Sequence, residues 1–159
     1  MISALDDVRV KDVMSEIVII VGGEDTIHNA LVLMAQYSVT VLPVVDKQNR
    51  CIGLLSTSDL IDPARELEEE LQDVERTFQQ GHVARLLLES LGQRKVSELM
   101  TAAVVTVDGD MPIMEATGEM LQHRVHHLPV VDAQHKIQGI VSTIDLLSAF
   151  HRCHADEPM

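Results

Sequence analysis

The chain has 159 residues, enough for one ordinary domain or two very small ones, and carries a net charge of −13. Apolar residues make up 46% and aromatic residues 2%, so the core is expected to be aliphatic and the fold to be mixed α/β. With 12 basic against 25 acidic residues and no cluster of lysines or arginines, binding to nucleic acid or to an anionic membrane is disfavoured.

The chain shows no sign of export or membrane insertion. Its N-terminus lacks a basic region followed by an apolar run, and no apolar run approaches the ~18–20 residues that a membrane span needs. Cys51 and Cys153 have no CxxC neighbour, which favours two free thiols in a reducing compartment. We therefore expect a cytoplasmic protein.

In chain order, residues 10–60 predict a helical turn, a strand, a helix, two strands and a second helix. The turn falls at 10–14 and the first strand at 17–21, before a Gly-rich turn. Apolar residues at helical spacing then predict a helix, and the strands 42–45 and 51–55 are joined by a polar, hairpin-like linker. A second helix is expected from Ser56-Thr57-Ser58-Asp59, whose small polar side chains can cap exposed N–H groups.

The same order returns 86 residues later. Residues 96–146 align with 10–60 without a gap and give 21 identities in 51 positions, so the duplication is real. The second copy predicts a helical turn at 96–100, strands at 103–107, 128–131 and 137–141, a helix after Pro112, and a helix from Ser142-Thr143-Ile144-Asp145. Neither copy alone hides both faces of a three-stranded sheet, so the copies are expected to pack on each other about a pseudo-twofold axis.

The segment between the copies differs in kind. Leu67, Leu71, Val74 and Phe78 are spaced as on one side of an amphipathic helix whose other side is acidic. Helical spacing resumes from Val83 to Leu91, before a possible stop at Gly92. Two interpretations stay open: a surface connector lying on its own domain, and a dimer seam or partner contact.

The two Ser-Thr-x-Asp steps are the candidate sites. An aspartate can accept hydrogen bonds from vicinal ribose hydroxyls, and a serine hydroxyl with free N–H groups at a helix start suits a phosphate. Apolar strand residues can supply a slot for a base. The alternative for each aspartate is a plain helix cap.

Metal binding and catalysis find little support. Zinc needs three or four well-spaced ligands, whereas the histidines and cysteine at His123, His126, His127, His151, Cys153 and His154 lie at a helix end or in the tail. The chain has no G-x-S-x-G elbow, P-loop or G-x-G-x-x-G after a strand. We expect neither a metal site nor an enzyme.

The repeated motifs, a Met-containing lead-in, a Val-rich strand, LPVVD and G-h-h-S-x-x-D-L, resemble a tandem pair of CBS domains (a Bateman module), over about two thirds of the chain. The resemblance implies an α/β (α+β) fold of two β-α-β-β-α repeats about a pseudo-twofold axis. The expected parts are CBS repeat 1 at 8–62, an acidic helical connector at 63–94, CBS repeat 2 at 95–151 and a C-terminal tail at 152–159.

The resemblance also implies two clefts between the repeats for adenosyl compounds such as AMP, ADP or ATP, with no obligatory cofactor. One cleft would use Ser142 and Asp145, with Thr143 adjacent, together with Ser15, Ile20, Val39 and Thr40; the other would use Ser56, Asp59, Thr101, Thr106, Val125 and His126. His126 and His127 stand where nucleotide-binding members often contact phosphate, and would face the Asp145 cleft. The first repeat has Thr40 and Val41 there, so we expect unequal clefts, the Asp145 cleft being better equipped.

Three hypotheses for function follow. The leading one is a stand-alone regulatory module in which adenine nucleotide shifts the packing of the repeats and signals to an unidentified partner protein. The second is a structural or dimerisation module with vestigial clefts, and the third an enzyme with unrecognised chemistry. The resemblance further implies a homodimer.

Overall fold

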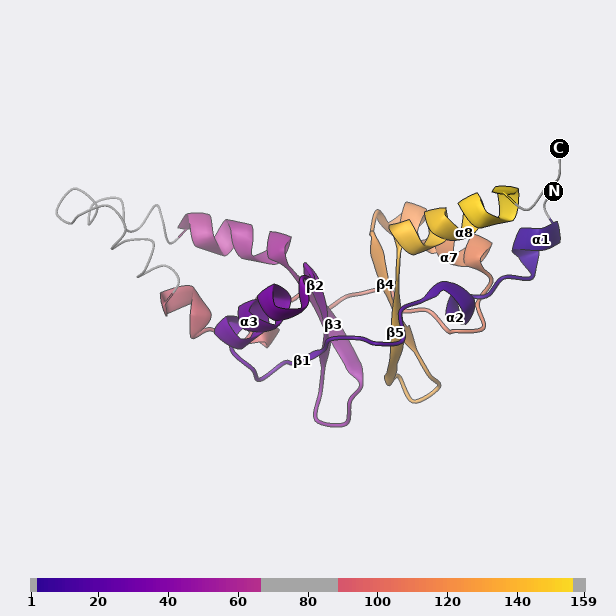
Figure 1. Cartoon of the computed structure of the whole chain (residues 1–159). Helices are drawn as coiled ribbons and strands as arrows, with labels where there is room; N and C mark the ends of the chain where they lie inside the picture. The colour runs from indigo at the N-terminus through magenta and orange to yellow at the C-terminus, as the bar shows by residue number, and fades with distance from the viewer. Residues whose placement is uncertain (1–2, 67–88, 156–159) are drawn as a thin grey trace. The chain divides into compact units, whose positions relative to one another are not determined.

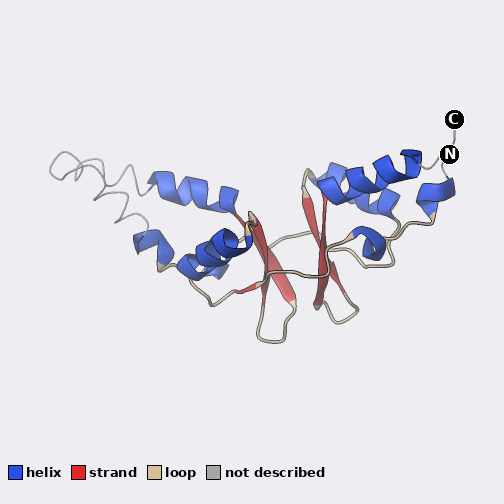
Figure 2. Ribbon diagram, viewed as in Figure 1, coloured by secondary structure: helices blue, strands red, loops and turns tan. Residues whose placement is uncertain are grey.

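The computed structural model describes residues 3–66 and 89–155 (Figure 1). It confirms a mixed α/β fold, with small sheets and several helices in both repeats (Figure 2). The elements are α1 Ser3–Asp6, α2 Val10–Val13, β1 Val21–Gly22, α3 Ile27–Tyr37, β2 Val41–Val45, β3 Cys51–Ser56, the 3-10 helix η1 Thr57–Leu60, α6 Val96–Leu99, α7 Ile113–His123, β4 His127–Val131, β5 Ile137–Ser142 and α8 Thr143–Ala155.

The chain folds into two compact units, and each unit draws on both repeats. Unit 1 contains Met1–Val18, Gln48–Cys51 and Val104–Met159, and unit 2 contains Ile19–Lys47 and Ile52–Ala103. The N-terminal lead-in, which is the segment up to Val18, therefore completes the unit that the second repeat builds. In the same way, the second lead-in, which is the start of the second repeat up to Ala103, completes the unit that the first repeat builds.

Unit 2 has a sheet in the order β1-β2-β3, with β1 parallel to β2. Helix α3 begins at Thr26, whose hydroxyl oxygen accepts a hydrogen bond from the Asn29 N–H at 3.2 Å. The helix buries Ile27, Ala30 and Met34, three of the residues whose spacing predicted it. It ends at Ser38, which adopts the left-handed conformation.

Unit 1 has the antiparallel hairpin β4–β5, in which Leu128 pairs with Val141. Helix α7 buries Ile113, Ala116 and Met120 and ends at left-handed Arg124, as α3 does at the equivalent position. Helix α8 packs beside α7 (Figure 1). The lead-in residue Val10 is fully buried in this core, so unit 1 cannot be completed without the start of the chain.

The predicted strands at 17–21 and 103–107 are much shorter than expected. Only Val21 and Gly22 form a strand, and only Val107 of the second segment pairs, through a parallel bridge to Val130. The Val- and Ile-rich composition favours extended backbone, but strand formation also needs a neighbouring strand, and Ile17 is 90% exposed.

Each lead-in crosses a strand at a glycine. Ser15 exchanges backbone hydrogen bonds with Ile140 at 2.9 and 3.1 Å, and Thr101 does so with Leu54 at 2.9 and 3.0 Å. A Cβ atom on Gly139 would lie 2.8 Å from the Ser15 carbonyl oxygen, and one on Gly53 would lie 2.7 Å from that of Thr101. The glycine of each G-h-h-S-x-x-D-L motif is thus required for the close approach of the lead-in backbone.

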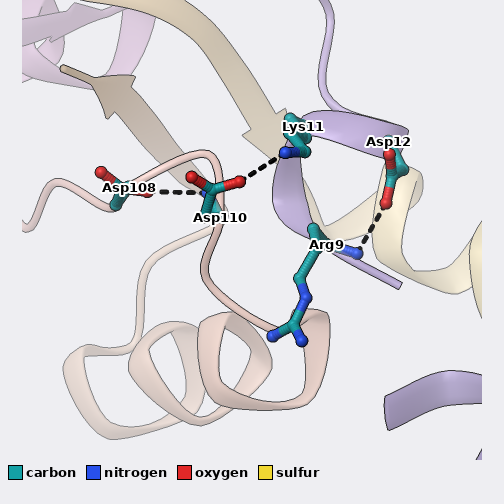
Figure 3. Close-up of polar contacts among 5 residues, drawn as sticks. All are labelled: Arg9, Lys11, Asp12, Asp108 and Asp110. Atoms are coloured by element: carbon teal, nitrogen blue, oxygen red, sulfur yellow. Dashed lines mark hydrogen bonds and ion pairs between the residues drawn. The ribbon is translucent and has the colours of Figure 1, made fainter. Parts of the chain in front are cut away.

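Ion pairs hold both lead-ins at the surface, and Figure 3 shows the pair in unit 1. In unit 1, Lys11 pairs with Asp110, which raises the pKa of Lys11 and lowers that of Asp110. In unit 2, Lys95 pairs with Glu24 at 2.6 Å, with the same directions of pKa shift. All four side chains are exposed to solvent, so these pairs fix position more than they add stability.

Most of the predicted connector, including Leu67, Leu71, Val74 and Phe78, lies outside the described residues. Helical structure is present again from residue 89 and ends at Gly92, as predicted, with Leu91 buried in the core of unit 2. Cys51 and Cys153 form no disulfide, and Cys51 is buried. Over residues 3–66 and 89–155, no helix combines the length and the apolar character needed to span a bilayer.

Candidate functional site

The Asp145 step lies in unit 1, where β5 passes into α8. The Asp145 carboxylate oxygen Oδ2 accepts two hydrogen bonds, from the Ser142 N–H at 2.7 Å and from the Ser142 hydroxyl at 2.8 Å. The Asp145 N–H in turn approaches the Ser142 hydroxyl oxygen at 3.2 Å. This reciprocal arrangement is a capping box, so the helix-cap interpretation of Asp145 holds.

The cap uses only one oxygen of the carboxylate. Among the described residues, Oδ1 of Asp145 has no hydrogen-bond partner, and the residue is only partly buried. A carboxylate oxygen carries two lone pairs, so Oδ1 can still accept hydrogen bonds from hydroxyl groups of a ligand. Capping and ligand binding are therefore compatible at this aspartate.

The Asp59 step in unit 2 has the same cap with one difference. Oδ2 of Asp59 accepts from the Ser56 N–H at 2.7 Å and from the Ser56 hydroxyl at 3.1 Å. Oδ1 of Asp59 accepts from the Thr101 hydroxyl at 3.2 Å. Both oxygens of Asp59 are thus engaged within the unit, whereas Asp145 keeps one available.

The two histidines ahead of the LPVVD strand lie beside the Asp145 step. His127 begins β4 and pairs with Ser142 on β5. The carbonyl oxygen of His126 accepts hydrogen bonds from the N–H of Thr143 at 2.9 Å and from its hydroxyl at 3.3 Å. Unit 1 therefore brings together five predicted site residues, namely His126, His127, Ser142, Thr143 and Asp145.

The environment of His127 favours its neutral form. Burial lowers the pKa of His127 below its ordinary value of 6.5, and His126 lowers it further, while the Asp145 carboxylate acts in the opposite direction. A neutral imidazole can still donate one hydrogen bond to a phosphate oxygen. A bound anion would raise the proton affinity of this ring.

Replacing His127 by glutamine is expected to reduce the loss of unfolding free energy at acid pH. Because its pKa is lowered in the folded state, His127 binds more proton in the unfolded chain, so the wild type loses stability as pH falls below about 6.5. Urea unfolding between pH 5 and 8 measures this loss, which should be smaller in His127→Gln. If the free energy of unfolding varied with pH in the same way in both proteins, His127 would not have a lowered pKa in the folded state.

The remaining predicted residues are divided between the units. Ser15, Thr106 and Val125 belong to unit 1 with Asp145, and Ile20, Val39 and Thr40 belong to unit 2 with Asp59. Thr40 reproduces the role of His126, since its carbonyl oxygen accepts from the Thr57 N–H at 3.1 Å. Each predicted cleft set thus includes residues of both units, and its assembly around a ligand stays a prediction.

Two features of the steps were not predicted from the sequence. One is the bond from Thr101 to Asp59, although the Ser15/Thr101 difference between the repeats was a visible signal. The other is the contact of the lead-in methionines with the motif glycines: a Cβ on Gly139 would lie 2.6 Å from the Met14 sulfur. Within the part of the chain that the structure describes, no three His, Cys, Asp or Glu side chains are grouped as metal ligands would be.

Comparison with known proteins identifies the family. The CBS domain model matches residues 10–65 and 96–152, which together exceed half of the chain. The chain belongs to the CBS domain family and contains a pair of these domains.

Relatives and solved structures agree with this assignment. The CBS domain-containing protein YhcV of Bacillus subtilis is 34% identical over 137 residues, covering 86% of this chain and 81% of YhcV. The CBS domain of a membrane protein from Sphaerobacter thermophilus superposes with a TM-score of 0.75 at 26% identity, covering 92% of this chain and 90% of that one. CBSX2, solved in complex with AMP, gives a TM-score of 0.70 at 27% identity, covering 92% and 98%.

Some relatives are much longer than this chain. Inosine-5'-monophosphate dehydrogenase of Methanocaldococcus jannaschii is 28% identical over 142 residues, covering 89% of this chain, which spans only 22% of the enzyme. The chloroplastic CBSX1 of Arabidopsis thaliana is 27% identical over 130 residues, covering 78% of this chain, which spans 55% of CBSX1. The pair of domains thus occurs both in short proteins and within larger ones.

Proposed function

We propose that this CBS domain pair is a regulatory module that binds an adenine nucleotide at the Asp145 step. The observation that carries the proposal is the unpaired Oδ1 of Asp145, held by its cap beside two histidines. The AMP complex of CBSX2, at 27% identity, supports a ligand of the adenosyl class.

Each part of an adenosine monophosphate has a group of matching chemistry. The ribose hydroxyls would donate to Asp145 Oδ1, and a charge-assisted hydrogen bond of this kind is stronger than a neutral one. The phosphate would accept a hydrogen bond from the His127 ring. For the base, the apolar contacts of Ile20 and Val39 stay a prediction from the sequence.

The proposed role is binding rather than catalysis. The Ser142 hydroxyl donates to the Asp145 carboxylate at 2.8 Å, so its proton is held by the cap. Ser142 therefore serves to orient the carboxylate.

Regulation would act through the lead-ins, each of which belongs to the unit that the other repeat builds. Ser15 is joined to β5 beside the Asp145 step and is followed in the chain by the part that enters unit 2. A nucleotide that prefers one arrangement of this segment shifts the population toward it, by no more than its differential affinity for the two states. An unidentified partner protein would read that shift.

Isothermal titration calorimetry of the full chain tests the proposal. We would titrate AMP, ADP, ATP, NAD and S-adenosylmethionine at pH 7.5, with GMP as a control for the base. Saturable heat from at least one adenosyl compound is expected. An absence of binding by all of them at concentrations near one millimolar would overturn the proposal.

We further propose that the chain forms a homodimer through its exposed apolar helix residues. Leu121 of α7 is 75% exposed, and Met114 lies seven residues earlier on the same side of the helix. Ile144 and Leu147 of the neighbouring α8 are also exposed. In a self-complementary interface across a twofold axis, each contact is made twice. Such twofold dimers are the commonest homo-oligomers.

The Leu121→Lys variant is expected to shift the chain toward monomer. A charge at the centre of an apolar contact must be desolvated, while the same lysine costs little on the free surface. Sedimentation velocity over a range of concentrations measures the change. The control is Val32→Lys, at an exposed residue of α3 in unit 2, which should leave the dimer intact. A wild type that is monomeric at every concentration would refute the proposed dimer.

A further inference from the structure

The two lead-ins end in different hydroxyl residues at equivalent places. Ser15 and Thr101 are related by the 86-residue offset, and each exchanges two backbone hydrogen bonds with the strand beneath it. The four backbone distances lie between 2.9 and 3.1 Å, so both residues are placed alike relative to their strands. Any difference in what they do arises in the side chains.

The side chains do differ. The Thr101 hydroxyl donates to Oδ1 of Asp59 at 3.2 Å, which is the oxygen that the cap leaves open. Over the described residues, the Ser15 hydroxyl makes no hydrogen bond, and Oδ1 of Asp145 keeps its lone pairs available. In unit 2 a hydroxyl of the chain itself therefore stands where a ligand hydroxyl would donate.

The side-chain types explain why this difference can persist. Threonine is β-branched, so its γ-methyl group restricts the rotation about χ1 and helps to hold the hydroxyl in one direction. Serine has no such group, and an exposed serine hydroxyl exchanges readily between rotamers. Threonine thus loses less side-chain freedom than serine when its hydroxyl bonds to the carboxylate.

We propose that Thr101 competes with a ligand for Oδ1 of Asp59, so that adenine nucleotide binds more weakly at the Asp59 step than at the Asp145 step. This inference rests on the proposed function and assigns Thr101 the role of an internal competitor for the ribose hydroxyls. It adds a second cause of inequality to the absence of histidines ahead of the first LPVVD strand. The choice of hydroxyl at the end of each lead-in sets how strongly the neighbouring aspartate binds a ligand.

A reciprocal exchange of side chains tests this role. Thr101→Val keeps the shape and the β-branch but removes the donor, and should strengthen binding of a second AMP by about three- to tenfold. Ser15→Thr places the competitor at the other step and should weaken the first site by a similar factor. Both are measured by calorimetry with AMP on the full chain.

A ligand-free measurement accompanies the titrations. Without nucleotide, Thr101→Val should move the side-chain carboxyl carbon resonance of Asp59 and leave that of Asp145 in place. This signal reports the hydrogen bond itself, and a merely structural change in unit 2 would not be confined to one carboxylate.

The outcomes separate the two ideas. A second site in wild type that is weaker than the first and becomes stronger in Thr101→Val supports the inference. Two equal sites in wild type, or a Thr101→Val protein whose second site is unchanged, overturns the inference and leaves the proposed function standing. An absence of binding of AMP and of every other adenosyl compound in the panel, by wild type and by Thr101→Val, overturns both.

Discussion

Replacing Asp145 by asparagine is expected to lower the affinity for AMP by about 10- to 100-fold, because charge-assisted hydrogen bonds to ribose hydroxyls are replaced by weaker ones to an amide. Asparagine keeps a carbonyl oxygen that can accept the Ser142 N–H bond, so the start of α8 should survive. Calorimetry gives the affinity, and circular dichroism checks that the fold is retained.

Asp59→Asn is the matched control for this variant. The two aspartates have the same cap, but Oδ1 of Asp59 already accepts from Thr101. Asp59→Asn should therefore leave the first AMP equivalent bound within about twofold of wild type, a difference well below one hydrogen bond. Equal losses in the two variants, or a larger loss in Asp59→Asn, would reverse the assignment of the better site.

Gly139→Ala is expected to destabilise unit 1 by about 1–3 kcal/mol, the usual cost of forcing an added methyl group into a packed site. The new Cβ would lie 2.8 Å from the Ser15 carbonyl oxygen, and backbone cannot yield as the end of a flexible side chain can. Urea unfolding measures the free energy of unfolding. Gly53→Ala should show the same effect in unit 2, where the distance to the Thr101 carbonyl oxygen is 2.7 Å.

Gly118→Ala serves as the control in the same unit. This glycine lies inside α7, and nothing within 4 Å would meet an added Cβ. Alanine should stabilise the helix by about 0.5–1 kcal/mol, since glycine loses more backbone freedom on folding. Measurement at two protein concentrations separates this gain from any change in self-association. A stable Gly139→Ala protein would show that the lead-in does not cross β5 closely.

The elements of the fold could be predicted where local pattern and packing agree. Ile27, Ala30 and Met34 recur at helical spacing, and the structure buries all three, because the same positions face the sheet. The segment 17–21 was predicted as a strand from its valines and isoleucines, but only its last residue joins a ladder. Composition reports a preference for extended backbone and does not report whether a neighbouring strand is present.

The candidate site was predictable in its residue types and less so in its bonding. The repeated Ser-Thr-x-Asp step marked both aspartates, and the contrast of His126 and His127 with Thr40 and Val41 indicated unequal sites. The competing bond from Thr101 depends on where the lead-in crosses β3. The bond joins residues 42 positions apart and could not be found from local spacing.

The exchange of lead-ins also has a consequence for the time course of synthesis. Val10 leaves the ribosome early, but Gly139 and Ile140, which its segment must meet, follow more than a hundred residues later. At ~5–20 residues per second, the N-terminal segment waits roughly 6–25 s for them. Unit 2, which needs nothing beyond residue 103, can fold during that interval. The segment around Val10 is thus synthesised before unit 2 but docks after it, and the nascent chain exposes this segment to chaperones meanwhile.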